Sequence, residues 1–188
     1  NEGAAGTAGS NIIMSLQNDR RADLEFRLDG VGPFVVPNNI VTSGNDGGET
    51  RVINVGSYDG SSSNQLVQLS GNLTIGHGGA HVTNGGDSSA IYFDGSNGYQ
   101  FEVTGTTTLN RSIVLRTRGA ITTLSGTVAG AVANILEKSE QGTLVLSGNN
   151  TFASGLLISN GYVVAGSDTG LGPATATFRN NSFSQILA

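Results

Sequence analysis

The residues whose types and spacing could support catalysis or metal binding are two histidines and three arginines. His77 and His81 lie four residues apart, a spacing that aligns two metal ligands on a helix. The glycines between them disfavour a helix and favour a polar corner loop. Arg111, Arg116 and Arg118 could supply the base of a carbohydrate-active enzyme, but Arg116 and Arg118 share one strand face and could equally form its solvated side. We therefore assign no catalytic residue and no metal ligand.

The carboxylates are scattered, and four of them stand directly before a glycine: Asp29, Asp46, Asp59 and Asp94. A carboxylate in such a position hydrogen-bonds nearby backbone N–H groups and so forms turns. Calcium binding is the alternative. The glycine-glycine-x-glycine-x-aspartate repeat that stacks calcium in secreted β-rolls is not reproduced by Gly85-Gly86-Asp87, which occurs once. We expect no resident cofactor, with calcium left open.

The composition favours a chain of many corners and few helices. It has 188 residues, 29 glycines and 3 prolines, and 12% of its residues are charged, which fits one domain with a sizeable core. The net charge of -5 argues against a nucleic-acid or anionic-membrane partner. No cysteine is available for disulfides, and no apolar run is long enough for a transmembrane helix. No signal peptide is recognisable in the first residues, which fits either a mature chain after signal removal or a fragment.

Short strands alternate with turns along the chain. Leu24, Phe26 and Leu28 alternate with polar residues, which predicts a half-buried strand. Pro33 and Pro37 flank the next apolar run, so this run is predicted to be an edge strand or a corner. The tripeptide Leu-Ser-Gly begins at Leu69, Leu124 and Leu146. The last two copies are about one coil apart. The gap between the first two is longer and is not a multiple of that coil, which indicates that insertions interrupt the early coils.

The stretch from Leu136 to Gly172 has the strongest pattern. Leu144 and Leu146 share one face of a strand that Gly148-Asn149-Asn150 ends. Leu156 and Ile158 then alternate inward, Asn160-Gly161 turns the chain, and Val163 and Ala165 repeat the alternation. This pattern predicts three strands and three corners of a β-solenoid. At roughly 20 to 25 residues a coil, the whole chain would hold about eight coils.

This stretch resembles the autotransporter-associated β-strand repeat. The matching residues are Lys138, Gly142, Thr143, Leu144, Leu146, Gly148, Asn150, Phe152, Gly155, Ile158, Gly161 and Val163, and residues 106–130 resemble what precedes such repeats. Together these segments cover a little over a third of the chain. The sequence departs at Glu140, where glycine is usual, and at Leu156 and Leu157, where threonines are common. The resemblance implies a right-handed parallel β-helix in a surface-exposed or secreted bacterial protein.

We expect an all-β fold, a right-handed parallel β-helix (β-solenoid) with short strands and corners rich in Gly, Asn and Asp. Residues 1–18 are expected to form a flexible arm or cap, and residues 19–188 one solenoid, with 136–172 as the best-matched repeat. Residues 11–16 are apolar, but their pattern does not decide between helix and strand. The structural residues are expected to be Leu144, Leu146, Ile158 and Val163 in the core, Gly142, Gly148 and Gly161 at corners, and Asn150 in an asparagine ladder, for which Asn72, Asn110, Asn149 and Asn181 are further candidates.

The expected function is that of a non-enzymatic, extracellular structural solenoid at the outer surface of a bacterium, a stalk or a fibre-forming subunit. One alternative is an adhesin passenger that binds glycans or a host or matrix surface, and another is a carbohydrate-active β-helix enzyme. The partner of an open solenoid end is expected to be a further coil of the same chain or a second copy stacked end to end.

Overall fold

The computed structural model describes residues 8–16, 21–44, 50–76, 90–131, 134–153, 155–173, 175–179 and 184–187. Within these ranges the regular secondary structure consists of β-strands alone, β1 to β19. No helix in them is long and apolar enough to span a membrane.

The strands form three sheets in which all neighbours are parallel. Sheet A contains β1 (Asn11–Leu16), β4 (Asn39–Gly44), β7 (Leu73–Ile75), β10 (Thr107–Leu109) and β13 (Val128–Gly130). Sheet B contains β2 (Arg21–Arg27), β5 (Thr50–Gly56), β8 (Ala90–Gly95), β11 (Ile113–Arg118), β14 (Leu136–Ser139), β16 (Leu156–Ile158) and β18 (Ala176–Phe178). Sheet C contains β3 (Phe34–Val36), β6 (Leu66–Leu69), β9 (Gln100–Val103), β12 (Ile121–Leu124), β15 (Thr143–Leu146), β17 (Gly161–Ala165) and β19 (Ser184–Leu187).

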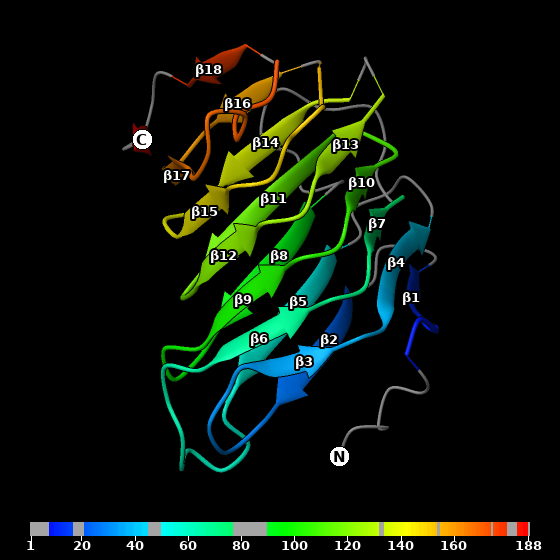
Figure 1. Ribbon diagram of the computed structural model, residues 1–188, viewed down its shortest axis with the longest axis vertical. Coiled ribbons are helices and arrows are strands. Elements are labelled where there is room, and N and C mark those ends of the chain that lie inside the picture. Colours follow the sequence, from blue (N-terminus) through cyan, green and yellow to red (C-terminus); the bar gives the residue numbers. More distant parts are fainter. Residues whose placement is uncertain are drawn as a thin grey trace.

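Each turn of the chain adds one strand to sheet B and one to sheet C, and each of the first five turns also adds one to sheet A, so the strands of every sheet stack in sequence order (Figure 1). This arrangement confirms the all-β, parallel β-helix fold. Sheets B and C have seven strands each, which gives seven coils in the described part of the chain rather than about eight.

The coil count falls short of the prediction because the early coils are longer than the late ones. In sheet B, Arg21 pairs with Thr50, and Thr50 pairs with the distant Ala90. From Leu136 onward the spacing between paired residues of sheet B is short and even, since Leu136 pairs with Leu156 and Leu156 pairs with Ala176. The predicted insertions into the early coils are thus confirmed.

The long gap between the first two Leu-Ser-Gly tripeptides consists of two unequal coils. Leu69 pairs with Val103, and Val103 pairs with Leu124, so the first of these coils is the longer. The leucines of all three tripeptides therefore belong to one column of sheet C, because Leu124 also pairs with Leu146.

The core lies between the three sheets and consists of columns of aligned inward side chains. In sheet C one column runs through Val67, Phe101, Thr122, Leu144 and Val163, all of them buried. Burying a Val, Leu or Phe side chain contributes about 1.5 to 3 kcal/mol. Because parallel strands in register place each such side chain against the same position of the next coil, every coil completes the core of its neighbours.

The N-terminal coil includes the segment whose conformation the sequence left undecided. Residues 11–16 form β1, which pairs with β4 along its whole length, so the first strand of the solenoid lies upstream of residue 19. The strand predicted over Leu24, Phe26 and Leu28 is β2. The segment between Pro33 and Pro37 is β3, whose one described partner strand is β6, so the predicted edge strand is confirmed.

Sheet A ends at β13, and the last two coils close their third side with irregular chain. Thr151 still donates its N–H to the carbonyl of Val128 at 2.9 Å. The Phe152 ring is fully buried on this side. The segments 148–153 and 166–173 therefore take the place that β13 and its predecessors occupy in earlier coils.

Candidate functional site

The residues that the sequence singled out lie in two consecutive coils, on β14 to β17 and the corners between them. Leu144 and Leu146 project inward from β15, Ile158 from β16 and Val163 from β17. All four side chains have 0% exposure. Each lies on the inner face because residues two apart on a strand share a face.

Lys138 lies at the end of β14 and is the single lysine of the chain. It occupies an inward position, because its strand partners are Leu115 and Ile158, and it is 0% exposed. Its Nζ donates to three backbone carbonyls, those of Ser139 at 2.8 Å, Glu140 at 2.7 Å and Asn160 at 3.0 Å. The ammonium group therefore joins the corner of its own coil to the corner of the next.

Each of the two corners that Lys138 connects contains a residue with a positive φ. Glu140 has a φ of 67° and Gly161 a φ of 77°, both in the left-handed region. A left-handed non-glycine residue costs free energy, and three charge-assisted hydrogen bonds offset that cost. Burial lowers the pKa of Lys138 to about 8, although the charge of Glu140 acts in the opposite direction.

Asn150 performs a similar task where sheet A has ended. Its side chain is 3% exposed. Its Oδ1 accepts from the N–H of Val128 at 2.7 Å, and its Nδ2 donates to the carbonyl of Gly170 at 2.5 Å. Val128 belongs to the preceding coil and Gly170 to the following one, so a single amide side chain connects three coils.

Two further asparagines, Asn39 and Asn72, connect successive coils at the corners where the strands of sheet A begin. Asn39 accepts from the N–H of Asn72 at 2.9 Å, and Asn72 accepts from the N–H of Thr106 at 2.9 Å. The sequence indicates Asn72 for such a ladder but not Asn39. The side chains of Asn72 and Asn150 bond backbone groups and not one another's amides, so the predicted ladder of stacked amides does not form at either residue. Of the other candidates, Asn110 and Asn149 are exposed, and Asn181 lies outside the described residues.

The three corner glycines are needed for two different reasons. Gly161 requires a left-handed φ. A Cβ at Gly142 would lie 2.6 Å from the carbonyl oxygen of Thr117, and one at Gly148 would overlap the carbonyl oxygen of Gly126. Gly142 and Gly148 are therefore positions of close approach between coils.

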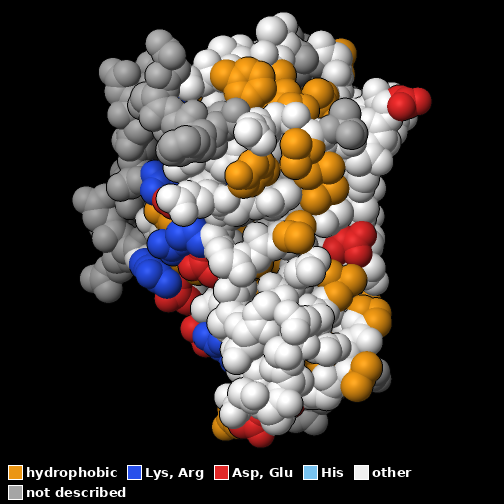
Figure 2. All heavy atoms as spheres, turned by 90° about the vertical axis from the view of Figure 1, so that its left-hand side faces the viewer, with side chains coloured by type: hydrophobic (Ala, Val, Ile, Leu, Met, Phe, Trp, Pro, Cys, Tyr) orange, Lys and Arg blue, Asp and Glu red, His pale blue; other side chains and the backbone are white. Residues whose placement is uncertain are grey.

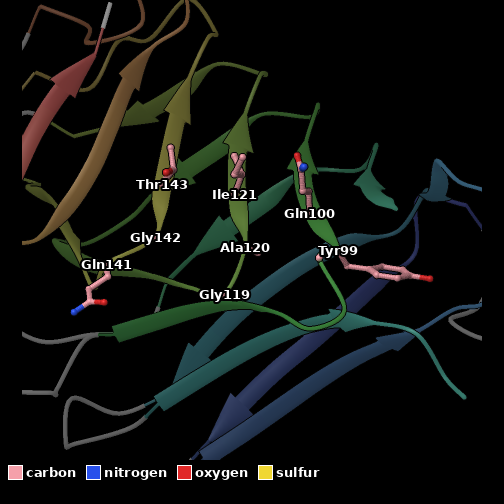
Figure 3. A pocket seen from close by; sticks show the side chains of 9 residues that line it. Tyr99, Gln100, Gly119, Ala120, Ile121, Gln141, Gly142 and Thr143 are labelled. Atoms are coloured by element: carbon pink, nitrogen blue, oxygen red, sulfur yellow. The ribbon is translucent and has the colours of Figure 1, made fainter. Parts of the chain in front are cut away.

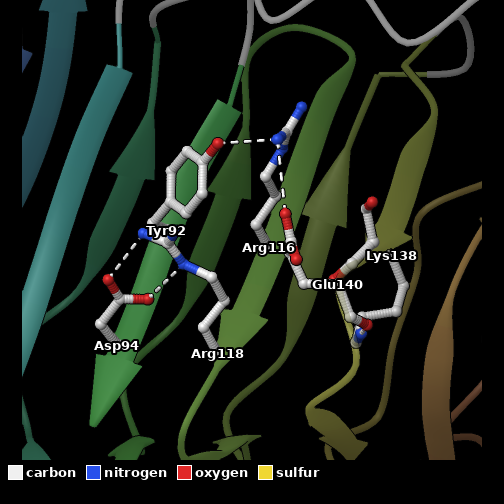
Figure 4. A network of polar contacts seen from close by, with 7 residues as sticks. Tyr92, Asp94, Arg116, Arg118, Lys138 and Glu140 are labelled. Carbon is white, nitrogen blue, oxygen red and sulfur yellow. Dashed lines mark hydrogen bonds and ion pairs between the residues drawn. The ribbon is translucent and has the colours of Figure 1, made fainter.

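The charged side chains on the outer face of sheet B are paired with one another (Figure 4). Arg118 makes two hydrogen bonds to Asp94, at 3.0 and 2.8 Å, and lies 4.3 Å from the ring centre of Tyr92. Arg116 donates to the Tyr92 hydroxyl at 2.7 Å and lies 3.5 Å from a carboxylate oxygen of Glu140. The pairing with Asp94 raises the pKa of Arg118 above its ordinary value, so this arginine is a poor base.

Of the aspartates that precede glycines, Asp59 forms a local turn as predicted, whereas Asp29 holds the corner of the next coil and Asp94 pairs with Arg118. Asp29 accepts hydrogen bonds from the backbone N–H groups of Tyr58 at 3.0 Å and Asp59 at 3.3 Å, and from the Ser57 hydroxyl. Asp59 accepts from Ser61, whose side chain and backbone lower its pKa. Neither carboxylate projects into a cluster of ligands, and the described residues contain no group of three or more side chains able to hold a metal ion.

Several residues considered for chemistry lie outside the described part of the chain: His77, His81, Asp46 and Gly85-Gly86-Asp87. Arg111 lies within the described residues and is exposed at the corner before β11.

Comparisons of the chain with protein-family models, curated proteins and solved structures find no match in any of the three.

The main structural residues that sequence reasoning missed are in β14. The polar pair Glu137-Lys138 obscured this strand, yet Leu136 and Lys138 are two apart and both face inward. Glu137 is also buried, and its carboxylate accepts from the Ser159 hydroxyl at 2.5 Å and lies 3.5 Å from Arg179. The sequence does contain a signal for Lys138: it lies two residues after Leu136, so on a strand it would occupy the same inward face.

Proposed function

We propose that this chain is a non-enzymatic structural segment of an extracellular bacterial surface protein, a stalk or a fibre-forming subunit. The observation that carries the proposal is the uninterrupted parallel pairing of seven successive strands in each of sheets B and C. A chain paired in this way resists bending and extension, because each coil is hydrogen-bonded to the coils on both sides.

The use of the ionisable groups supports a structural role. Lys138 holds backbone carbonyls, Asp29 holds backbone N–H groups, and Arg118 pairs with Asp94. General acid–base catalysis on a carbohydrate needs two carboxyl groups that converge on the substrate. In the described coils the carboxylates of Asp29, Asp94 and Glu137 are instead engaged with fold-stabilising partners.

The extracellular location is supported by the composition and by the resemblance to autotransporter repeats. Glycine, serine, threonine and asparagine dominate the corners, and no cysteine is present. A fold without cysteine is compatible with export through an oxidising compartment.

The strands at the two ends of the described solenoid suggest how it could be extended. β2 and β3 at one end, and β18 and β19 at the other, each pair with one described strand. Exposed backbone edges of this kind pair with further strands, from the same chain or from a second copy.

The experiment is negative-stain electron microscopy of the purified chain over a hundredfold range of concentration. Filaments that lengthen with concentration, with a rung spacing of about 4.8 Å in fibre diffraction, are expected for end-to-end stacking. Separate rods of one length at every concentration would contradict the fibre form. Hydrolysis of polysaccharides by the same preparation would contradict the non-enzymatic assignment.

A further inference from the structure

The corner between sheets B and C changes in length along the solenoid. In the early coils this corner is a long loop, as between β5, which ends at Gly56, and β6, which begins at Leu66. In the fourth coil it shortens to the two residues between β11 and β12. A recess of about 390 Å³ opens at this change, lined by residues 98–100, 119–121 and 141–143.

The lining of the recess is uncharged and combines polar with apolar groups (Figure 3). Gln100 and Gln141 are exposed, and Thr143 is half-buried. Ile121 is 39% exposed. Tyr99 contributes backbone, because its ring is buried against Phe34 and points away from the three outward side chains, Gln100, Ile121 and Thr143.

The outward side chains form a row across successive coils. Ile121 pairs with Thr143 and Thr143 with Tyr162, while Gln100 precedes the paired residue Phe101 by one position. Such neighbours are about 4.8 Å apart. Tyr162, 40% exposed, extends the row beyond the recess. The row therefore presents an amide, an aliphatic group, a hydroxyl and an aromatic ring at regular intervals.

One carboxylate lies beside this row: Glu102 is two residues from Gln100 on the same face of β9 and accepts hydrogen bonds from Gln68 at 2.9 Å and Ser125 at 2.5 Å. Figure 2 shows hydrophobic side chains over the centre of the face, and basic side chains, with acidic ones beside them, near one margin. Arg116 and Arg118, on the outer face of sheet B, are paired with carboxylates. No residue lining the recess carries a formal charge at neutral pH.

We propose that this recess binds a linear, neutral saccharide chain that lies across the coils. Amide and hydroxyl side chains exchange hydrogen bonds with sugar hydroxyls, while Ile121 and Tyr162 can contact the apolar C–H faces of sugar rings. The net charge of -5 disfavours a polyanionic saccharide. This binding site goes beyond the structural role and does not depend on it.

A peptide is disfavoured as the occupant by the pairing of the strands beneath the recess. Peptides commonly dock by adding a strand to a sheet edge. The strands β9, β12 and β15 are each paired on both sides, so they offer a sheet face and no edge.

The test is an NMR titration of the whole chain with three hexasaccharides, maltohexaose, cellohexaose and laminarihexaose. We expect at least one to shift the amide signals of residues 98–100, 119–121 and 141–143, with a Kd on the order of 1 mM, as for an open site with few contacts. Hexagalacturonate, the anionic control, should bind at least tenfold more weakly.

Two variants and one matched control locate the site. Ile121→Glu and Thr143→Ala should each weaken binding about tenfold. Val35→Glu changes an exposed residue on the same outer face, away from the recess, and should leave the Kd unchanged. Circular dichroism verifies that each variant is folded.

Three results would overturn the proposal: no shift with any neutral hexasaccharide up to about tenfold above the expected Kd, a Kd unchanged in both folded recess variants, or tighter binding of hexagalacturonate. A loss of binding in Val35→Glu equal to that in Ile121→Glu would also overturn it, because the site would then lie elsewhere.

Discussion

Lys138 illustrates how a buried charge can stabilise a corner that the backbone alone disfavours. An ammonium group without partners in a protein interior is costly. Here three carbonyl oxygens, from two successive coils, surround it within 3.0 Å. The left-handed corner at Glu140 therefore persists although glycine would suit it better.

Lys138→Met should destabilise the chain by about 2 to 3 kcal/mol, because it leaves buried carbonyl groups without their donor. Urea unfolding followed by circular dichroism measures the loss. Arg118→Met is the matched control: it removes a half-exposed cation of the same sheet, and a surface ion pair contributes about 0 to 1 kcal/mol. Equal losses in the two variants would contradict a special role for Lys138.

The pH dependence of stability gives a second test of the same residue. Burial lowers the pKa of Lys138 from 10.5 to about 8 in the folded chain. Between these pH values the unfolded chain binds more protons than the folded chain, so the stability contributed at this site rises with pH. Below about pH 8 both states are protonated and the contribution is constant.

Wild type should therefore gain stability relative to Lys138→Met as the pH rises from about 8 to 10.5. Urea unfolding of both proteins at several pH values measures the difference, and the variant removes the contribution of all other titrating groups. A difference between the two proteins that is constant across this range, or that shrinks with rising pH, would refute the lowered pKa.

At the scale of the element, the corner that leaves sheet C is built from a column of glycines. Gly71, Gly105, Gly126 and Gly148 follow β6, β9, β12 and β15, and a Cβ at Gly105, Gly126 or Gly148 would overlap the carbonyl oxygen of the preceding glycine in the column. This close stacking is the physical reason why glycine recurs in Leu-Ser-Gly.

Gly148→Ala should destabilise the chain by about 2 to 3 kcal/mol, because the coils must move apart or the methyl group must be accommodated by strain. Gly60→Ala separates this effect from backbone strain, since Gly60 has a φ of 81° but open space around it. The control should cost about 1 kcal/mol. Thermal unfolding compares the two, and a larger loss at Gly60 would show that close packing at Gly148 is unimportant.

The fourth coil has an inward threonine on each wall: Thr107, Thr117 and Thr122. Their hydroxyls are buried and have no hydrogen-bond partner in the described structure. Thr107→Val and Thr122→Val should each stabilise the chain by about 1 kcal/mol, because an unsatisfied hydroxyl is replaced by a methyl group of similar shape.

Thr108→Val and Thr123→Val are the controls for this prediction. These residues adjoin the buried threonines on the same strands but are only partly buried. Their unfolding midpoints in urea should stay close to that of wild type. Destabilisation by both inward substitutions would show that the hydroxyls are satisfied, for example by internal water.

The sequence predicted the elements more fully than the contacts between them. Period-two alternation identified β2 and β15, and glycine and asparagine marked the corners. The lengths of the early coils could not be predicted, because loops inserted at corners carry no periodic signal. The contacts of Lys138 with Asn160 and of Gly142 with Thr117 could not be predicted either, since each partner lies about one coil away in the chain.

At the scale of the whole molecule, each coil is stabilised chiefly by its two neighbours. Strand pairing in sheets B and C connects coil to coil without a break, and the core columns follow the same order. In such a stack, stability is approximately a sum of coil and interface contributions. A substitution that weakens one interface between coils should therefore lower the stability of some coils more than that of others.

Lys138→Met weakens the interface between the fifth and sixth coils, because Lys138 and Asn160 belong to successive coils. Two coils, containing β16 to β19, lie on one side of that interface and five on the other. The smaller part buries less core and should open first. Hydrogen exchange measured by mass spectrometry should show faster exchange in β16 to β19 of the variant, with β5 and β8 retaining wild-type rates. Equal acceleration in all strands would instead mean that the solenoid unfolds as one cooperative unit, and the additive description of its coils would then be wrong.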